Sequence, residues 1–143
     1  MKAVLVDSSV WIDHLRGAVT PGTRALCVLL DALDPEAGED DPADILVGDL
    51  VLLEVLRGIH DDRQHDRTRT ALLAFPQVSL GGAATSLAAI DHDRFLRRRG
   101  SPVRKAVDCL IAAWCIAHDV TLLHADRDFT PFADHCGLRV FQP

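Results

Sequence analysis

The sequence has 143 residues, 48% of them hydrophobic and 25% charged, which is enough apolar material for a single domain over residues 1–143. This composition excludes a disordered, collagen-like or linker-like chain. The four cysteines lack the CxxC spacing of redox and zinc-ribbon sites, so we expect free thiols and a cytoplasmic protein. The first apolar run stops at Asp7, and the longest, Ile45–Ile59, contains three charged residues. Neither an export signal nor a membrane span is therefore predicted.

The formal net charge of −6 argues against a protein that simply coats nucleic acid, because phosphate binding uses Lys and Arg. The charge is unevenly distributed, however. Six basic residues and no acidic one lie between Arg94 and Lys105, whereas the rest of the chain has 9 basic against 21 acidic residues. We expect one basic patch on an acidic body.

Apolar runs separated by turn residues predict strands and helices that alternate along the chain. The expected strands are 2–6, 45–47, 77–80, 120–123 and 138–141. The expected helices are 8–17, 25–33, 50–58, 60–74, 84–96, 103–118 and 129–135. In the helix over 50–58, Leu52, Leu53 and Leu56 should form the buried side. The segment 34–44, with six acidic residues and two prolines, is expected to be a solvated loop.

This alternation predicts an α/β fold with three layers, α/β/α, around a mostly parallel central sheet. In such sheets, ligands bind at the carboxyl ends of the strands, at the point where the strand order reverses. The polar residues that follow each strand are therefore the first candidates for a functional site.

Four acidic residues stand near such positions. Asp7 follows the first strand directly, and Asp126 comes three residues after Leu123. Glu54 and Asp108 lie inside otherwise apolar helical stretches. A carboxylate buried in this way is costly unless it is paired or bound to a cation.

Carboxylates that converge without enough cationic neighbours repel one another, and a hard divalent cation relieves this repulsion. Mg²⁺ or Mn²⁺ takes oxygen ligands and leaves positions open for a substrate phosphate. The expected chemistry is hydrolysis, in which the metal polarises a phosphoryl group and activates water.

Each acid also has a simpler structural explanation. Asp7 could only cap the first helix, and Asp126 and Asp128 could be turn and cap residues. Glu54 could pair with Arg57 on its own helix. Asp108 could likewise pair with Arg104 or Lys105 one turn earlier.

Four segments together resemble PIN-domain ribonucleases, and most closely the VapC-type toxins of prokaryotic toxin–antitoxin pairs. They occur in the order and at the spacing of the family and cover nearly the whole chain. These segments are VLVDSSVWID at 4–13, LEVLRG at 53–58, VDCLIAA at 107–113 and LLHADRDF at 122–129.

The resemblance implies that four acids bind metal and catalyse RNA cleavage with Mg²⁺ or Mn²⁺. The residues that match this set are Asp7, Glu54, Asp108 and Asp126. Asp128 matches a further, less certain metal-binding acid, and Ser9 matches a hydroxyl residue that hydrogen-bonds near the first acid. The resemblance also implies a homodimer that a small cognate antitoxin, VapB-like, holds inactive. Cys109, where a small Ala is common, and the acidic 34–44 segment depart from the family pattern.

Arg104 and Lys105 lie one turn before Asp108 on the expected helix 103–118, where they could guide RNA phosphates toward the acids. A solvated charged face explains them equally well. Other function classes also stay open: a phosphatase or receiver-type domain, although Ser9 stands where such a phosphatase needs a second Asp, and a metal-binding interaction module without catalysis.

Overall fold

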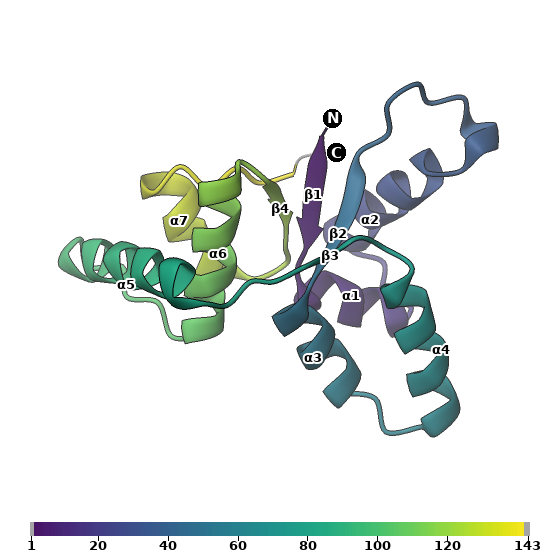
Figure 1. Ribbon diagram of the computed structural model, residues 1–143, viewed down its shortest axis with the longest axis horizontal. Helices are drawn as coiled ribbons and strands as arrows, with labels where there is room; N and C mark the ends of the chain where they lie inside the picture. Colours follow the sequence, from purple (N-terminus) through teal and green to yellow (C-terminus); the bar gives the residue numbers. More distant parts are fainter. Residues whose placement is uncertain (1, 142–143) are drawn as a thin grey trace.

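A computed structural model describes residues 2–141 (Figure 1). Its sheet has four parallel strands in the order β3-β2-β1-β4. The strands are β1 (Ala3–Val6), β2 (Asp44–Gly48), β3 (Gln77–Val78) and β4 (Thr121–Leu123). The helices are α1 (Ser8–Leu15), α2 (Pro21–Ala32), α3 (Asp49–Arg57), α4 (Asp62–Leu73), α5 (Ala83–Arg98), α6 (Ala106–His118) and α7 (Thr130–His135). Two short 3₁₀ turns, η1 (Pro35–Ala37) and η2 (Arg127–Phe129), complete the elements.

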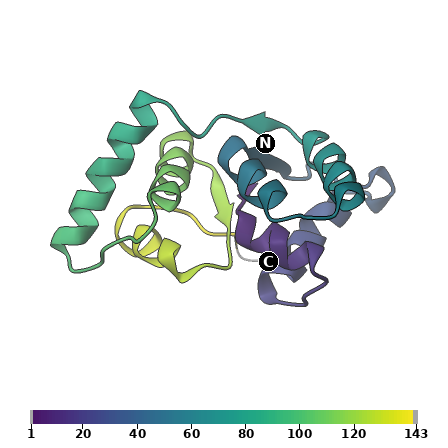
Figure 2. The same cartoon turned by 90° about the horizontal axis from the view of Figure 1, so that it is seen from below.

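The helices form two layers, one on each side of the sheet. Helices α1 to α4 lie on one side and α5 to α7 on the other, as the two views in Figures 1 and 2 agree. The strands between them are buried on both faces, and Val4, Leu5 and Val6 are each at most 3% exposed. A continuous apolar strand of this kind is typical of a parallel sheet covered by helices. The expected three-layer α/β/α fold with a parallel sheet is confirmed.

The strand order reverses between β1 and β4. From β1 the chain moves outward to β2 and β3, and it then returns to place β4 on the other side of β1. The backbone N–H of Asp7 donates to the carbonyl oxygen of Leu123 at 2.9 Å, so the carboxyl ends of these two strands are adjacent. The fold thereby creates its ligand-binding switch point between the residues that follow β1 and β4.

Three expected element boundaries are wrong. Helix α2 begins at Pro21, because Thr20 forms a capping box with Thr23 and proline suits the first helical position. Helix α6 begins at Ala106, since Lys105 and the residues before it are extended or irregular. The expected strand over 138–141 is a single bridge between Val140 and Leu122.

The expected buried side of α3 is also wrong. Leu53 is 61% exposed, whereas Val51 and Val55 are the fully buried residues of this helix. The leucines at 52, 53 and 56 allow more than one apolar stripe, and packing against α1 and β2 selects the Val51–Val55 face. Leu52 and Leu56 lie partly buried beside it.

Among residues 2–141, no helix is both long enough and apolar enough to cross a membrane. The four cysteines are free thiols, as expected.

The end of β2 approaches Leu80 so closely that only glycine fits. A Cβ added to Gly48 would overlap the side chain of Leu80, which is fully buried. We expect Gly48→Ala to lower the free energy of unfolding by about 1–3 kcal/mol through overpacking. Denaturant unfolding measures this change.

Gly81 provides the matched control, because an added Cβ there meets nothing within 4 Å. Gly81→Ala should change the free energy of unfolding by less than about 0.5 kcal/mol. Equal effects of the two alanine variants would contradict the proposed close approach.

Candidate active site

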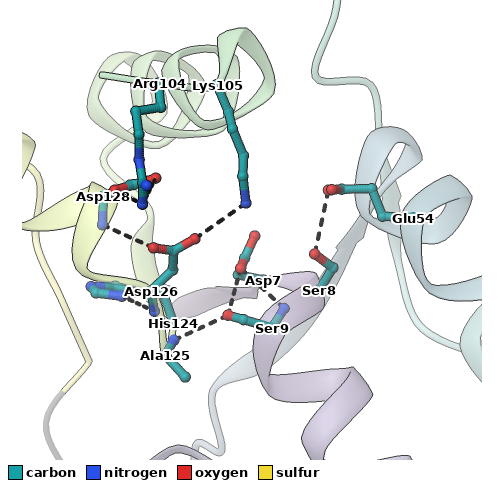
Figure 3. A network of polar contacts seen from close by, with 10 residues as sticks. All are labelled: Asp7, Ser8, Ser9, Glu54, Arg104, Lys105, His124, Ala125, Asp126 and Asp128. Carbon is teal, nitrogen blue, oxygen red and sulfur yellow. Dashed lines mark hydrogen bonds and ion pairs between the residues drawn. The ribbon is translucent and has the colours of Figure 1, made fainter. Parts of the chain in front are cut away.

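Asp7 occupies the turn between β1 and α1 and is buried. Its Oδ2 accepts hydrogen bonds from the backbone N–H of Ser9 at 3.1 Å and from the Ser9 hydroxyl at 2.6 Å. The Ser9 hydroxyl in turn accepts the N–H of Ala125 at 3.1 Å (Figure 3). Ser9 thus orients the first acid and joins the β1–α1 turn to the segment after β4, while Asp7 also caps α1.

Glu54 faces this turn from α3. The Ser8 hydroxyl donates to Glu54 Oε1 at 3.3 Å. The Glu54 carboxylate therefore points toward Ser8 and Asp7 (Figure 3). Burial and, next, the negative charge of Asp7 raise the pKa of Glu54. No ion pair forms with Arg57 among the described residues. The sequence analysis assigned no role to Ser8, whose contact with Glu54 depends on the approach of α3 to the β1–α1 turn.

Asp108 stands in the first turn of α6 and is only 6% exposed. Its Oδ2 is buried and has no hydrogen-bond partner. Burial first, and then the charge of Asp7, raise the pKa of Asp108 to about 7. Neither Arg104 nor Lys105 forms an ion pair with Asp108 within the part of the chain that is described, so that structural explanation is wrong.

Asp126 and Asp128 lie after β4, in the turn η2. Asp126 Oδ1 accepts the N–H of Asp128 at 2.9 Å, so Asp126 is also a cap residue. The N–H of Asp126 donates to Nδ1 of His124 at 3.2 Å, and the His124 ring packs against Phe129. His124, which sequence reasoning gave no role, therefore shapes the turn that presents Asp126. Its place directly after a buried strand was the available signal.

Three of the acids come within reach of one ion. Oxygens of Asp108, Asp126 and Asp128 lie within 4.8 Å of one another. Asp7 and Glu54 are outside this group and approach it from the α1 and α3 side (Figure 3). The structure thus brings all five sequence-predicted acids to one end of the sheet, three of them as a compact cluster.

Arg104 and Lys105 end the connection before α6 rather than occupying its first turn, which corrects their expected place. Arg104 contacts both carboxylate oxygens of Asp128, at 3.2 and 3.4 Å. Lys105 Nζ lies 3.6 Å from Asp126 Oδ2. In this structure both cations therefore face the acidic site itself.

The residues fit a hard divalent cation. An unpartnered, buried carboxylate oxygen is costly, and here it lies among other carboxylates whose charges raise its proton affinity. A cation with oxygen ligands would satisfy that oxygen and offset the repulsion. Asp108, Asp126 and Asp128 have the donor type and spacing for such an ion. Asp7 is near enough for its charge to act on both Asp108 and Glu54.

Comparison with known proteins defines the class of this chain. The model of the family described as PIN domain matches residues 4–134. The chain therefore belongs to the PIN-domain family. VapC ribonuclease Mb1587 of Mycobacterium bovis and ribonuclease VapC11 of Mycobacterium tuberculosis are each 32% identical to it over 130 residues, 91% of this chain and of the relative. The resemblance to VapC-type PIN proteins is confirmed. Membership of the PIN-domain family excludes a phosphatase or receiver-type domain as the class of this chain.

Solved structures share the same fold. FitAcB from Neisseria gonorrhoeae superposes with a TM-score of 0.70 at 19% identity, covering 98% of this chain and 97% of that one. VapBC2 from Rickettsia felis, bound to a promoter DNA fragment, gives 0.69 at 16% identity and 97% coverage of both chains. Mycobacterium tuberculosis VapC20, a sarcin–ricin loop cleaving toxin, gives 0.65 at 16% identity, covering 99% of this chain and 100% of that one.

Removing the charge of Asp108 should stabilise the metal-free protein in a pH-dependent way. The folded-state pKa of Asp108 is about 7, against an ordinary value of 3.8. Between these values the unfolded chain releases a proton that the folded chain retains, so stability falls as pH rises through this window. Asp108→Asn should therefore gain on the order of 2 kcal/mol over wild type at about pH 8 in EDTA, and little at about pH 4.

Thermal unfolding across that pH range measures the difference, with exposed Asp91→Asn as the matched control. Added Mg²⁺ should narrow the gap by stabilising the wild type alone. A gain at Asp108 that is independent of pH would show that ionisation of this carboxyl is not the cause.

Proposed function

We propose that this chain, as one PIN domain over residues 1–143, is a Mg²⁺-dependent endoribonuclease and the toxin of a type II toxin–antitoxin pair. The observation that carries the proposal is the unpartnered oxygen of Asp108 within a set of five carboxylates from four separate parts of the chain: the β1–α1 turn, α3, α6 and η2. The names of the relatives, VapC ribonucleases, support RNA as the substrate.

The acids would bind the metal ion at the position where the RNA phosphate is cleaved. Asp108, Asp126 and Asp128 form the cation-binding cluster, and Asp7 completes it from the β1–α1 turn. A bound Mg²⁺ or Mn²⁺ supplies Lewis-acid chemistry for phosphodiester hydrolysis by water. Ser9 keeps Asp7 in place through two hydrogen bonds to the same carboxylate oxygen.

Glu54 is suited to proton transfer. Ser8 occupies its Oε1, which leaves Oε2 without a hydrogen bond from a described residue. Its raised pKa makes the carboxylate a better proton acceptor than an ordinary Glu. We assign Glu54 the role of receiving the proton of the attacking water at Oε2, alongside its contribution to the negative field that attracts the cation.

The proposed partners follow from the relatives. Several of the structural neighbours are VapBC complexes, which supports a VapB-like antitoxin as the partner of this chain. Four free thiols are compatible with the reducing cytoplasm as its location. We also propose that this chain forms a homodimer, as its resemblance to the family implies.

Asp7→Asn tests the enzymatic function. Loss of this carboxylate should reduce RNA cleavage by more than about 100-fold, because even an outer partner of a metal ligand is worth 10–100-fold. Ser9→Ala, which leaves Asp7 in place but unoriented, should lose about 10–100-fold. Cleavage of a labelled single-stranded RNA with Mg²⁺ measures both, and EDTA should abolish activity in every variant.

Asp66→Asn, at an exposed position on α4, is the control and should retain full activity. Circular dichroism establishes that each variant is folded. If the folded wild type binds Mn²⁺ but cleaves no RNA, the chain is instead a metal-binding interaction module.

A further inference from the structure

The acidic site contains its own counter-ions. Among residues 2–141, the ion pairs that involve site acids are Arg104 with Asp128 and Lys105 with Asp126. They neutralise the two outer acids of the metal-binding cluster and leave the Asp108 Oδ2 oxygen without a partner. The positive charges therefore lie on the same carboxylates that a divalent cation would use.

These ion pairs are weakly held. The side chains of Arg104 and Lys105 are 79% and 60% exposed, while those of Asp128 and Asp126 are mostly covered. Ion pairs with such exposed cations contribute little to stability, because water screens them and ordering long side chains costs entropy. Transfer of either cationic side chain to another anionic partner therefore costs little free energy.

Neither cation gains stability from the helix that follows it. Lys105 is the N-cap residue of α6 and forms no capping hydrogen bond through its side chain. Positive charge at a helix N-terminus also opposes the helix dipole. The acids of the site are thus the stabilising partners of these cations in this structure.

The connection that carries them can move more readily than the helices. The backbone N–H groups of residues 99–101 still donate to carbonyl oxygens of α5, and Gly100 adopts a φ of +78° just after that helix ends. Residues 102–105, beginning with Pro102, then link to α6 outside any helix or strand. Arg104 and Lys105 lie at the α6 end of this connection, at the edge of the metal-binding cluster (Figure 3).

We propose that Arg104 and Lys105 are exchangeable counter-ions of the active site. In the metal-free protein they occupy Asp128 and Asp126 and compete with the divalent cation. When the cation binds, these side chains are released and bind phosphates of the RNA backbone. The second step rests on RNA as the ligand in the proposed function, though not on its cleavage, whereas the competition with the cation rests on neither.

Mn²⁺ titration without RNA tests the competition. Arg104→Gln and Lys105→Gln should each tighten Mn²⁺ binding about two- to fivefold, the worth of an exposed ion pair, and the double variant should tighten it further. Lys105→Arg, which keeps the charge, should resemble wild type. Arg139→Gln is the matched control, because it breaks an exposed ion pair with Asp119 outside the site. Unchanged or weaker Mn²⁺ binding in the double variant would overturn the proposal.

Salt dependence of RNA binding tests the exchange. The measurement uses a labelled single-stranded RNA on the Asp7→Asn background, which blocks cleavage. With Mn²⁺, the double variant should reduce the slope of log affinity against log salt by about 1.4, corresponding to two lost phosphate contacts. In EDTA the slope should not change, because the acids retain both cations.

The outcomes separate the two proposals. An equal reduction of the slope with Mn²⁺ and with EDTA would overturn the exchange, since both side chains would then contact RNA without release by metal. Wild-type protein that cleaves no RNA, combined with tighter Mn²⁺ binding and the Mn²⁺-dependent slope change, would uphold the exchange and reject the ribonuclease function.

Discussion

Repulsion among carboxylates at one end of the sheet is the constraint on which the site depends. Asp108 is the centre of this constraint, because its environment withholds both water and a hydrogen-bond donor from one oxygen. A fold selected only for stability would have no reason to retain such an arrangement, since a neutral side chain of similar size would relieve the cost. This concentration of negative charge is instead suited to binding a small, doubly charged ion.

The sheet topology makes this concentration of charge possible. Reversal of the strand order places the ends of β1 and β4 side by side, and helices from opposite layers then add Glu54 and Asp108. Ser9 connects the segments that follow β1 and β4, because its hydroxyl donates to Asp7 and accepts the backbone N–H of Ala125. The ion pairs of Arg104 with Asp128 and of Lys105 with Asp126 are weak. Stronger ion pairs would compete more effectively with a divalent cation for the same carboxylates.

Much of this could be predicted from the sequence, because local signals suffice for strands and for acids placed at strand ends. Asp7 and Asp126 follow apolar runs, and Asp108 interrupts an apolar helix, so their unusual positions are visible without coordinates. Side-chain contacts cannot be predicted in this way, since they depend on how distant segments pack in the folded protein. The pairing of Lys105 with Asp126 across 21 positions, and the exposure of Leu53 in a leucine-rich helix, follow from how layers pack rather than from spacing. Thr20 and Pro21 signal the start of α2 in the sequence, but the same residues are also typical of an ordinary turn.

The pairing of β1 with β4 also has a consequence for synthesis on the ribosome. Asp7 is translated at least 101 residues before its companions at 108, 126 and 128. Because translation proceeds from the N-terminus, a nascent or prematurely terminated chain that ends before residue 108 lacks three of the five site acids. The proposed nuclease site would therefore be incomplete in chains that stop before residue 108.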